Sequence, residues 1–480
     1  MRKSLILAFL LLILSAAVIG GAYDLVDQSK ETVEIGETVL VGDRAEAAGI
    51  TATSRTTLDD RLFWSTAWDA GSEPQPQTEF RFSRARRGDM RDAEPSANLY
   101  FHTDFGISGN AIDLYKDEFA WELPVEPAIG VAERTAAGET RREVVLIKDY
   151  YDYYPLFLDF HSGRGPREGG PEERRAMCEA VTQYFQVPVD ERQKQEITVS
   201  KDDNGNIVEV DCNSVSGETA EEFTVSKYRD GTVTDSGKST AAEETNLITD
   251  AVVTEQGCYC LIQINDKDGR RAAGDWNNAG IHYMPFEASD TFLISAVERL
   301  RLIYPLDDGV TARDIAKSGD GKSLLLFTEE DGAQMLTVLD MESLETRQRL
   351  VLLQEGAGLS VWDVRIYEDF MVVPYSDDRF VLLTGGDNGY TLRMQGRFDG
   401  CGEIESGLPY GAALAYDGER LAIMYLADWY DSCRSYLLVY REQGPVFAAR
   451  YDHSFDRTLA ENYDQKVRPR EVEPLRITFE

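Results

Sequence analysis

The stretch that decides the fold is ARDIAKSGDGKSLLLFTEEDGAQMLTVLDMESLETRQRLVLL, residues Ala312–Leu353. It divides into four short segments rich in apolar residues, which are ARDIAKS, SLLLFTE, MLTVLDM and TRQRLVLL. Glycine- and aspartate-rich turns separate the segments, and GDGK joins the first to the second. This pattern predicts four successive antiparallel β-strands.

The same four-strand unit recurs twice toward the C-terminus. One copy reads WDVRIYE, FMVVPYS, RFVLLTG and TLRMQGRF, and the next reads GAALAYD, RLAIMYLA, RSYLLVY and VFAARYD. The turn aspartates Asp320, Asp369 and Asp417 stand 49 and 48 residues apart. A four-stranded unit at such a period predicts the blades of a β-propeller.

Upstream segments extend the pattern. LITDAVVT, CYCLIQIN, GIHYMPFE and RLRLIYPL predict another blade, and two hairpins within 196–237 predict one more. The stretches 39–83 and 99–160 would supply two further blades. We therefore expect an all-β protein, a β-propeller of about seven four-stranded blades over 39–480, with six or eight blades as alternatives.

Two further elements are expected within this domain. PEERRAMCEAVTQYF predicts one inserted helix near 171–186, because proline and two glutamates occupy its first turn and apolar residues share one face. EPLRITFE, from Glu473, predicts a terminal strand. Propellers commonly hide their terminal edges by completing a blade from both chain ends, so we expect its partner to be the first blade, near Val39–Gly42.

The N-terminus, MRKSLILAFLLLILSAAVIGGAYD, has two basic residues before an uncharged apolar run. As a helix the run would span roughly 28 Å, close to the ~30 Å hydrocarbon core of a bilayer. Small residues at 20–22 also provide a cleavage site. We expect 1–23 to be a membrane anchor or a signal peptide, 24–38 a linker, and the remainder extracytoplasmic, either tethered to the cell membrane or secreted.

The net charge of −36 repels nucleic-acid phosphates and anionic headgroups, so we expect no nucleic-acid partner and membrane contact only through the N-terminal helix. Solubility after export explains this acidity, and attraction of metal cations is the alternative. The four histidines stand singly, without the spacing of a zinc site. We expect neither a metal site nor a cofactor.

SGDGKSLLLF and AYDGERLAIM resemble the blades of bacterial exported β-propellers of the WD40-like and YVTN-like kind. The resemblance is best over Ala312–Tyr451. It departs from the family pattern in lacking Gly-His and Trp-Asp pairs and the sialidase-type aspartate box. Such propellers include both enzymes and binding proteins, so the resemblance implies a fold and no particular function.

Propeller geometry suggests a binding face. Loops from second to third strands, and loops between blades, open on the same face, where exposed aromatic rings beside charges could hold a sugar or a peptide. The alternative is that these rings only cap the blade ends. The candidate ligand-binding residues from two such loops are Arg270, Arg271, Asp275, Trp276, Asp428, Trp429, Tyr430 and Asp431.

The same geometry predicts a disulfide between Cys401 and Cys433, whose loops open on that face. It would close a 33-residue segment and add about 3–4 kcal/mol of stability. Two unpaired, packed cysteines are the alternative. Cys258 and Cys260 share one side of a strand, but their Cα atoms would lie roughly 6.5–7 Å apart, which is poor for bridging.

The aromatic stretch VVLIKDYYDYYPLFLDF, Val144–Phe160, predicts two strands with tyrosines at their connection. Strand alternation would let at most two of the four tyrosines face a ligand together, so we expect packing rather than a binding platform.

The chain lacks the motifs Gly-x-Ser-x-Gly, His-Glu-x-x-His and Gly-x-x-x-x-Gly-Lys, and no catalytic residue is nominated. We predict a non-catalytic binding or scaffold module for a protein, a peptide or an envelope glycan. The alternatives are an exported hydrolase or lyase that uses carboxylates on glycan or peptide, and an assembly or sensor subunit of an envelope complex.

Overall fold

The computed structural model describes residues 2–29, 33–58, 62–82, 96–103, 105–161, 166–167, 169–215, 221–227, 233–240, 246–265, 276–386, 389–399, 401, 404, 407–409, 411–426, 434–454 and 473–479. The chain divides into two compact units. The first comprises 1–92, 362–385 and 391–480, and the second comprises 93–361 and 386–390.

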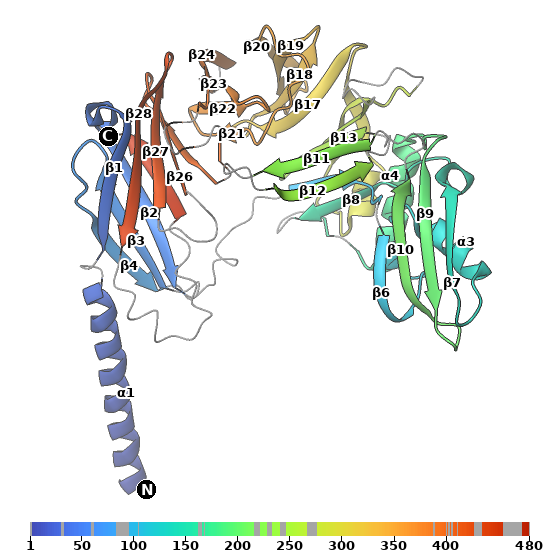
Figure 1. Cartoon of the computed structure of the whole chain (residues 1–480), viewed down its shortest axis with the longest axis horizontal. Coiled ribbons are helices and arrows are strands. Elements are labelled where there is room, and N and C mark those ends of the chain that lie inside the picture. The colour runs from blue at the N-terminus through green and yellow to red at the C-terminus, as the bar shows by residue number, and fades with distance from the viewer. Residues whose placement is uncertain are drawn as a thin grey trace. The chain divides into compact units, whose positions relative to one another are not determined.

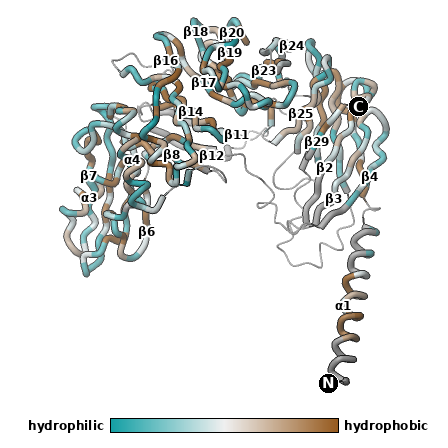
Figure 2. Tube along the Cα trace, turned by 180° about the vertical axis from the view of Figure 1, so that it is seen from behind, coloured by the Kyte–Doolittle hydropathy of each residue, from teal (hydrophilic) through white to brown (hydrophobic). Residues whose placement is uncertain are grey.

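The N-terminus is helical. Helix α1 spans Arg2–Ser29, and hydrophobic residues occupy its middle (Figures 1 and 2). The helix therefore includes the first part of the expected linker, 24–38. The last part of that linker belongs to strand β1 (Glu34–Gly42). Within the described residues, no helix combines the length and apolar character needed to cross a membrane.

Two sheets of the second unit follow the blade pattern. In each, consecutive strands pair antiparallel in chain order, as the sequence predicts. The first contains β13 (Asn246–Val253), β14 (Gly257–Asn265), β15 (Gly280–Pro285) and β16 (Arg301–Pro305). The second contains β17 (Val310–Lys317), β18 (Ser323–Glu330), β19 (Ala333–Asp340) and β20 (Thr346–Leu353). Apolar side chains of both sheets meet in one buried cluster that includes Leu261, Ile281, Ile315 and Leu326.

Two C-terminal sheets have the same order. One contains β21 (Arg365–Ile366), β22 (Phe370–Pro374), β23 (Arg379–Gly386) and β24 (Gly389–Arg397). The other contains β25 (Ala413–Tyr416), β26 (Leu421–Leu426), β27 (Arg434–Arg441) and β28 (Gly444–Ser454). Alternate residues of β22, β23, β26 and β27 form a shared core, so the two sheets pack face to face. The four strands predicted for each of the three blades over Ala312–Tyr451 are confirmed and pair in chain order, and the last sheet gains a fifth strand, β1.

The two chain ends complete the sheets of the first unit, and the C-terminal strand joins the region of the predicted first blade, although not at the predicted segment. Strand β29 (Glu473–Phe479) pairs antiparallel with β2 (Ile50–Leu58), which continues into β3 (Leu62–Asp69) and β4 (Gln77–Phe82). The expected partner near Val39–Gly42 belongs instead to β1, which forms a fifth strand on β28. Gly42 permits this pairing because its φ is 76° and an added Cβ would lie 1.8 Å from the carbonyl oxygen of Val446.

Two of the predicted blades are wrong. In the 99–160 region, β5 (Ser96–Tyr100) and β8 (Phe157–His161) pair with each other and extend the β13–β16 sheet. The hairpin β9 (Lys194–Lys201) and β10 (Ile207–Val215) forms as predicted, but it lies between β6 (Phe105–Ile112) and β7 (Thr140–Leu146) in a separate sheet. The second hairpin, β11 (Glu221–Lys227) and β12 (Val233–Thr240), forms a sheet of its own (Figure 1).

The physical reason for the separate sheet is a helix that the sequence analysis missed. Helix α3 (Val125–Arg134) buries Ala128, Val131 and Ala132 against Ile197 and Val199 of β9. One face of the β6–β10–β9–β7 sheet is therefore covered by α3, whereas the blades are covered by other sheets. The predicted inserted helix is confirmed as α4 (Pro171–Phe185), and a short helix, α5 (Leu293–Val297), packs beside it.

The tyrosine-rich stretch packs as expected. Its residues form β7, a short turn of helix at Ile147–Asp149, and β8. Tyr154 is fully buried and its hydroxyl bonds to the side chain of Gln193, while the hydroxyl of Tyr151 accepts a hydrogen bond from the backbone of Glu126. Structural packing therefore accounts for both of these rings.

We predict that the first unit depends on β29. Ile477 is 4% exposed within the core that joins β29 to the β25–β28 sheet. Replacing Ile477 by Ala should lower the free energy of unfolding by about 2–4 kcal/mol, because a buried Ile leaves a cavity. The neighbouring exposed Arg476 provides the control. R476A should change the free energy of unfolding, measured by urea denaturation, by less than about 0.5 kcal/mol. Equal effects of the two variants would contradict the docked strand.

Candidate functional site

Most of the predicted ligand-binding residues lie outside the described residues. These are Arg270, Arg271, Asp275, Asp428, Trp429, Tyr430 and Asp431. Trp276 is described and half-buried, and its indole Nε1 donates a hydrogen bond of 2.8 Å to the carbonyl oxygen of Phe185 at the end of α4. Asn278 Nδ2 donates to the same oxygen at 3.0 Å. Trp276 thus holds the helix end against the sheet, and a binding role for either loop stays a prediction.

The predicted disulfide is likewise untested. Cys401 is buried, and its Sγ lies 3.7 Å from the carbonyl oxygen of Asp399. Burial raises the pKa of the Cys401 thiol. Cys433 lies outside the described residues, so its pairing with Cys401 stays a prediction.

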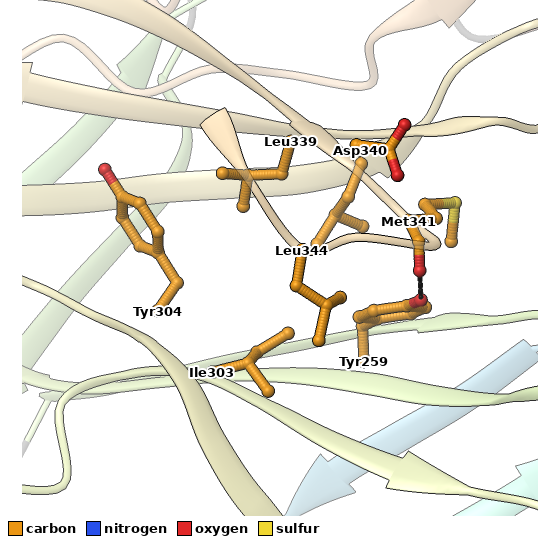
Figure 3. A pocket seen from close by; sticks show the side chains of 8 residues that line it. Tyr259, Ile303, Tyr304, Leu339, Asp340, Met341 and Leu344 are labelled. Atoms are coloured by element: carbon orange, nitrogen blue, oxygen red, sulfur yellow. Dashed lines mark hydrogen bonds between the residues drawn. The ribbon is translucent and has the colours of Figure 1, made fainter. Parts of the chain in front are cut away.

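A recess between two blade sheets does not form a ligand site. Figure 3 shows it between Tyr259 of β14 and the β19–β20 turn, where the Tyr259 hydroxyl donates to the carbonyl oxygen of Met341 at 2.9 Å. Its empty volume is ≈ 210 Å³ including open solvent, and it has no room for a whole water molecule. The lining residues are Tyr259, Ile303, Tyr304, Leu324, Leu339, Asp340, Met341 and Leu344. We interpret it as a packing gap.

A more promising arrangement joins two side chains of the second unit, His102 and Glu122. His102 follows β5, and Glu122 precedes α3. The two residues form an isolated parallel bridge, in which the backbone N–H of Leu123 donates to the carbonyl oxygen of His102 at 3.0 Å. This backbone pairing places His102 Nδ1 4.0 Å from Glu122 Oε2.

The environment of the pair is aromatic and only partly open. The side chain of His102 is 44% exposed and that of Glu122 is 16% exposed. The ring of Tyr100 meets His102 edge to face at 4.8 Å. Beside Glu122, Trp121 stacks on Phe157 at 4.7 Å, and the guanidinium of Arg174 lies 5.6 Å from its ring centre. Because Trp121 already contacts an aromatic ring and a guanidinium group, we assign it to the wall of the site and not to a platform on which a ligand would stack.

Burial gives Glu122 unusual chemistry. Desolvation of its carboxyl raises its pKa to about 7, so the group exchanges a proton near neutrality. When protonated it can donate a hydrogen bond, and when ionised it can only accept. A perturbed carboxyl beside an imidazole at a partly open surface is a candidate functional site.

The sequence did not reveal this pair. His102 and Glu122 are 20 residues apart in the chain, and neither belongs to a motif. The bridge that joins them lies outside the regular strands, so strand patterns do not predict it. No group of three or more His, Cys, Asp or Glu side chains within the described ranges is arranged to hold a metal ion.

No family model matches the chain, and no curated protein matches it. At the level of fold, the chain is similar to β-propeller proteins. One example is the β-propeller domain of Swd1 from Myceliophteria thermophila, with 12% identity, 54% of this chain and 82% of that chain covered, and a TM-score of 0.22. A protein from Lactobacillus plantarum is 11% identical, with 82% and 91% covered and a TM-score of 0.25.

A chain in the crystal structure of the mitotic checkpoint complex is 12% identical, with 42% of this chain covered and a TM-score of 0.21. This chain spans 46% of that chain's length. Because these TM-scores are low, the assignment of blades depends on the strand order within the sheets alone.

We predict that Glu122 makes stability fall as pH rises. Its folded pKa of about 7 lies above the unfolded value of about 4.5, so the folded state binds more protons between these values. Replacing Glu122 by Gln removes this titration. Between pH 4.5 and 7.5 the native protein should lose about 1–2 kcal/mol relative to E122Q, after discounting for solvent screening. The measurement is urea unfolding across this range.

The matched control for that experiment is E298Q, which removes an exposed carboxyl of the same unit. Its stability should follow the native curve at every pH. If E122Q and the native protein also gave parallel curves, the raised pKa of Glu122 would be refuted.

Proposed function

We propose that the chain is an extracytoplasmic binding protein built on propeller-type blades, and that the His102–Glu122 site contacts a peptide or an envelope glycan without catalysis. The observation that carries this proposal is the Glu122 carboxyl, whose pKa is raised to about 7, beside the half-exposed imidazole of His102. Hydroxyl and amide groups of a ligand would donate to the ionised carboxylate and exchange hydrogen bonds with the imidazole. The N-terminal charge pattern supports export, with α1 as an anchor or a signal.

The firm positioning of the site supports binding. The backbone bridge and the Tyr100 contact restrict His102, and Leu123 beside Glu122 is fully buried. A site whose polar groups are fixed before the ligand arrives loses less entropy on association. The aromatic rings of Tyr100 and Trp121 supply apolar area next to the imidazole and the carboxyl group, as in peptide and sugar sites.

A second candidate function is favoured by the same carboxyl. Glycosidases of the two-carboxylate kind use one acid with a raised pKa as proton donor and one ionised carboxylate. Glu122 has the property of the donor. A hydrolase or lyase of this kind therefore remains the alternative proposal, with Glu122 as its acid.

The test is a binding screen of the full-length protein, in detergent, against envelope glycan fragments and a peptide library at pH 5.5 and pH 8. Affinity for the bound class should rise with pH through about 7, because the ionised carboxylate accepts hydrogen bonds. E122Q should weaken binding at least about ten-fold at pH 8, equivalent to ~1.4 kcal/mol, whereas E298Q should leave it unchanged.

Turnover of a glycan or peptide that E122Q abolishes would replace the binding proposal by the hydrolytic one. Equal binding by E122Q and the native protein would refute the binding role of Glu122, and equal turnover by the two would refute its role as an acid. Cell fractionation tests the location, and a chain found wholly in the cytoplasm would contradict export.

A further inference from the structure

Three sulfur-containing residues of the second unit lie on one face of the β14–β15 pair, in the same buried cluster as Leu123. Cys258 and Cys260 are two residues apart on β14 and therefore point to the same face. Met284 of β15 is the direct cross-strand partner of Cys258. All three belong to one buried cluster and are at most 1% exposed.

The spacing of the two thiols suits metal coordination better than a disulfide. Their Sγ atoms lie 3.7 Å apart. A metal ion about 2.3 Å from both sulfurs would make an S–metal–S angle of roughly 107°, which fits three- or four-coordinate geometry. A disulfide would need a separation of about 2.05 Å, on a strand whose alternate Cα atoms are set too far apart.

The third donor is the thioether of Met284. Directly opposed residues of an antiparallel pair have Cβ atoms about 4.5–5.5 Å apart, a distance that the long methionine side chain spans easily. His282, opposite Cys260, is already engaged. Its Nδ1 lies 2.9 Å from the Tyr184 hydroxyl and its Nε2 lies 2.8 Å from the carbonyl oxygen of Asn278. The donor set is therefore two cysteines and one methionine.

We propose that Cys258, Cys260 and Met284 form a binding site for monovalent copper. Thiolate and thioether sulfurs are soft donors that select Cu(I) over harder divalent ions. Each cysteine thiol loses its proton to solvent as its Cu–S bond forms, and the thioether binds as a neutral donor. The occupied site then carries a single negative charge shared by the copper ion and the two thiolates, copper stays monovalent, and no oxidation takes place.

The surroundings of the sulfurs support a closed, dry site. The buried cluster around them includes Val181 and Phe185 of α4 and Leu293 and Val297 of α5. Exclusion of water protects Cu(I) from oxidation and strengthens bonds to soft ligands. Copper would enter through local opening of these helices, so equilibration should take longer than mixing.

The experiment is a titration of the reduced, full-length protein with Cu(I) in the presence of a competing Cu(I) chelator, after overnight equilibration. We expect one ion per chain and an ultraviolet thiolate-to-copper absorption band. C258S and M284L should each weaken binding at least ten-fold. Release of two protons should make the affinity rise about a hundred-fold per pH unit while both thiols of the free protein stay protonated.

The control is C178S, which removes a different buried thiol of the same cluster, on α4. It should bind copper as the native protein does. If C258S fails to fold by circular dichroism, M284L decides, because that exchange conserves volume. Absence of binding to the native protein would show that the thiols serve as packing groups. Unchanged binding by M284L, or loss of both thiols to a disulfide in peptide mapping, would also overturn the site.

Discussion

The first unit depends on the pairing of its two chain ends with the sheets. A sheet edge leaves a row of backbone N–H and C=O groups without partners, and an exposed edge invites pairing with other chains. Residues Glu473–Phe479 cover the free edge of β2, while Glu34–Gly42 cover the free edge of β28. Strand β29 also contacts β25 and β26, so its side chains fill the space between two sheets. The same few residues therefore close an edge and complete a core.

The second unit meets the same constraint by adding strands and helices to a blade. The β13–β16 sheet gains β5 and β8 at its edge, and α4 and α5 cover one face. The end of α4 is held by Trp276 and Asn278, which bond to the carbonyl oxygen of Phe185 that the helix leaves unpaired. A blade altered in this way buries a larger core than a four-stranded sheet alone, and it holds the cysteine pair within that core.

The parts of the fold that could be predicted are those that local interactions determine. Turn residues and alternating apolar residues were enough for β17–β20 and for the β9–β10 hairpin, because each strand pairs with its neighbour in the chain. The partners of β1, β6 and β7 lie far away in sequence, so only the final packing selects them. The His102–Glu122 pair could not be predicted for a different reason, because its chemistry comes from burial and not from a motif.

Burial also makes the ionisation of three described groups contribute to the pH dependence of stability. It lowers the pKa of His282 and that of His453 to about 4, so the unfolded state, with a value of about 6.5, binds more protons below pH 6.5. Both histidines therefore reduce stability as the pH falls from 6.5 through 4. Glu122 acts in the opposite direction up to about pH 7, but it is one group against two. These three groups together favour the folded state most strongly near pH 7, where the histidines are mostly neutral in both states and Glu122 is about half ionised in the folded state.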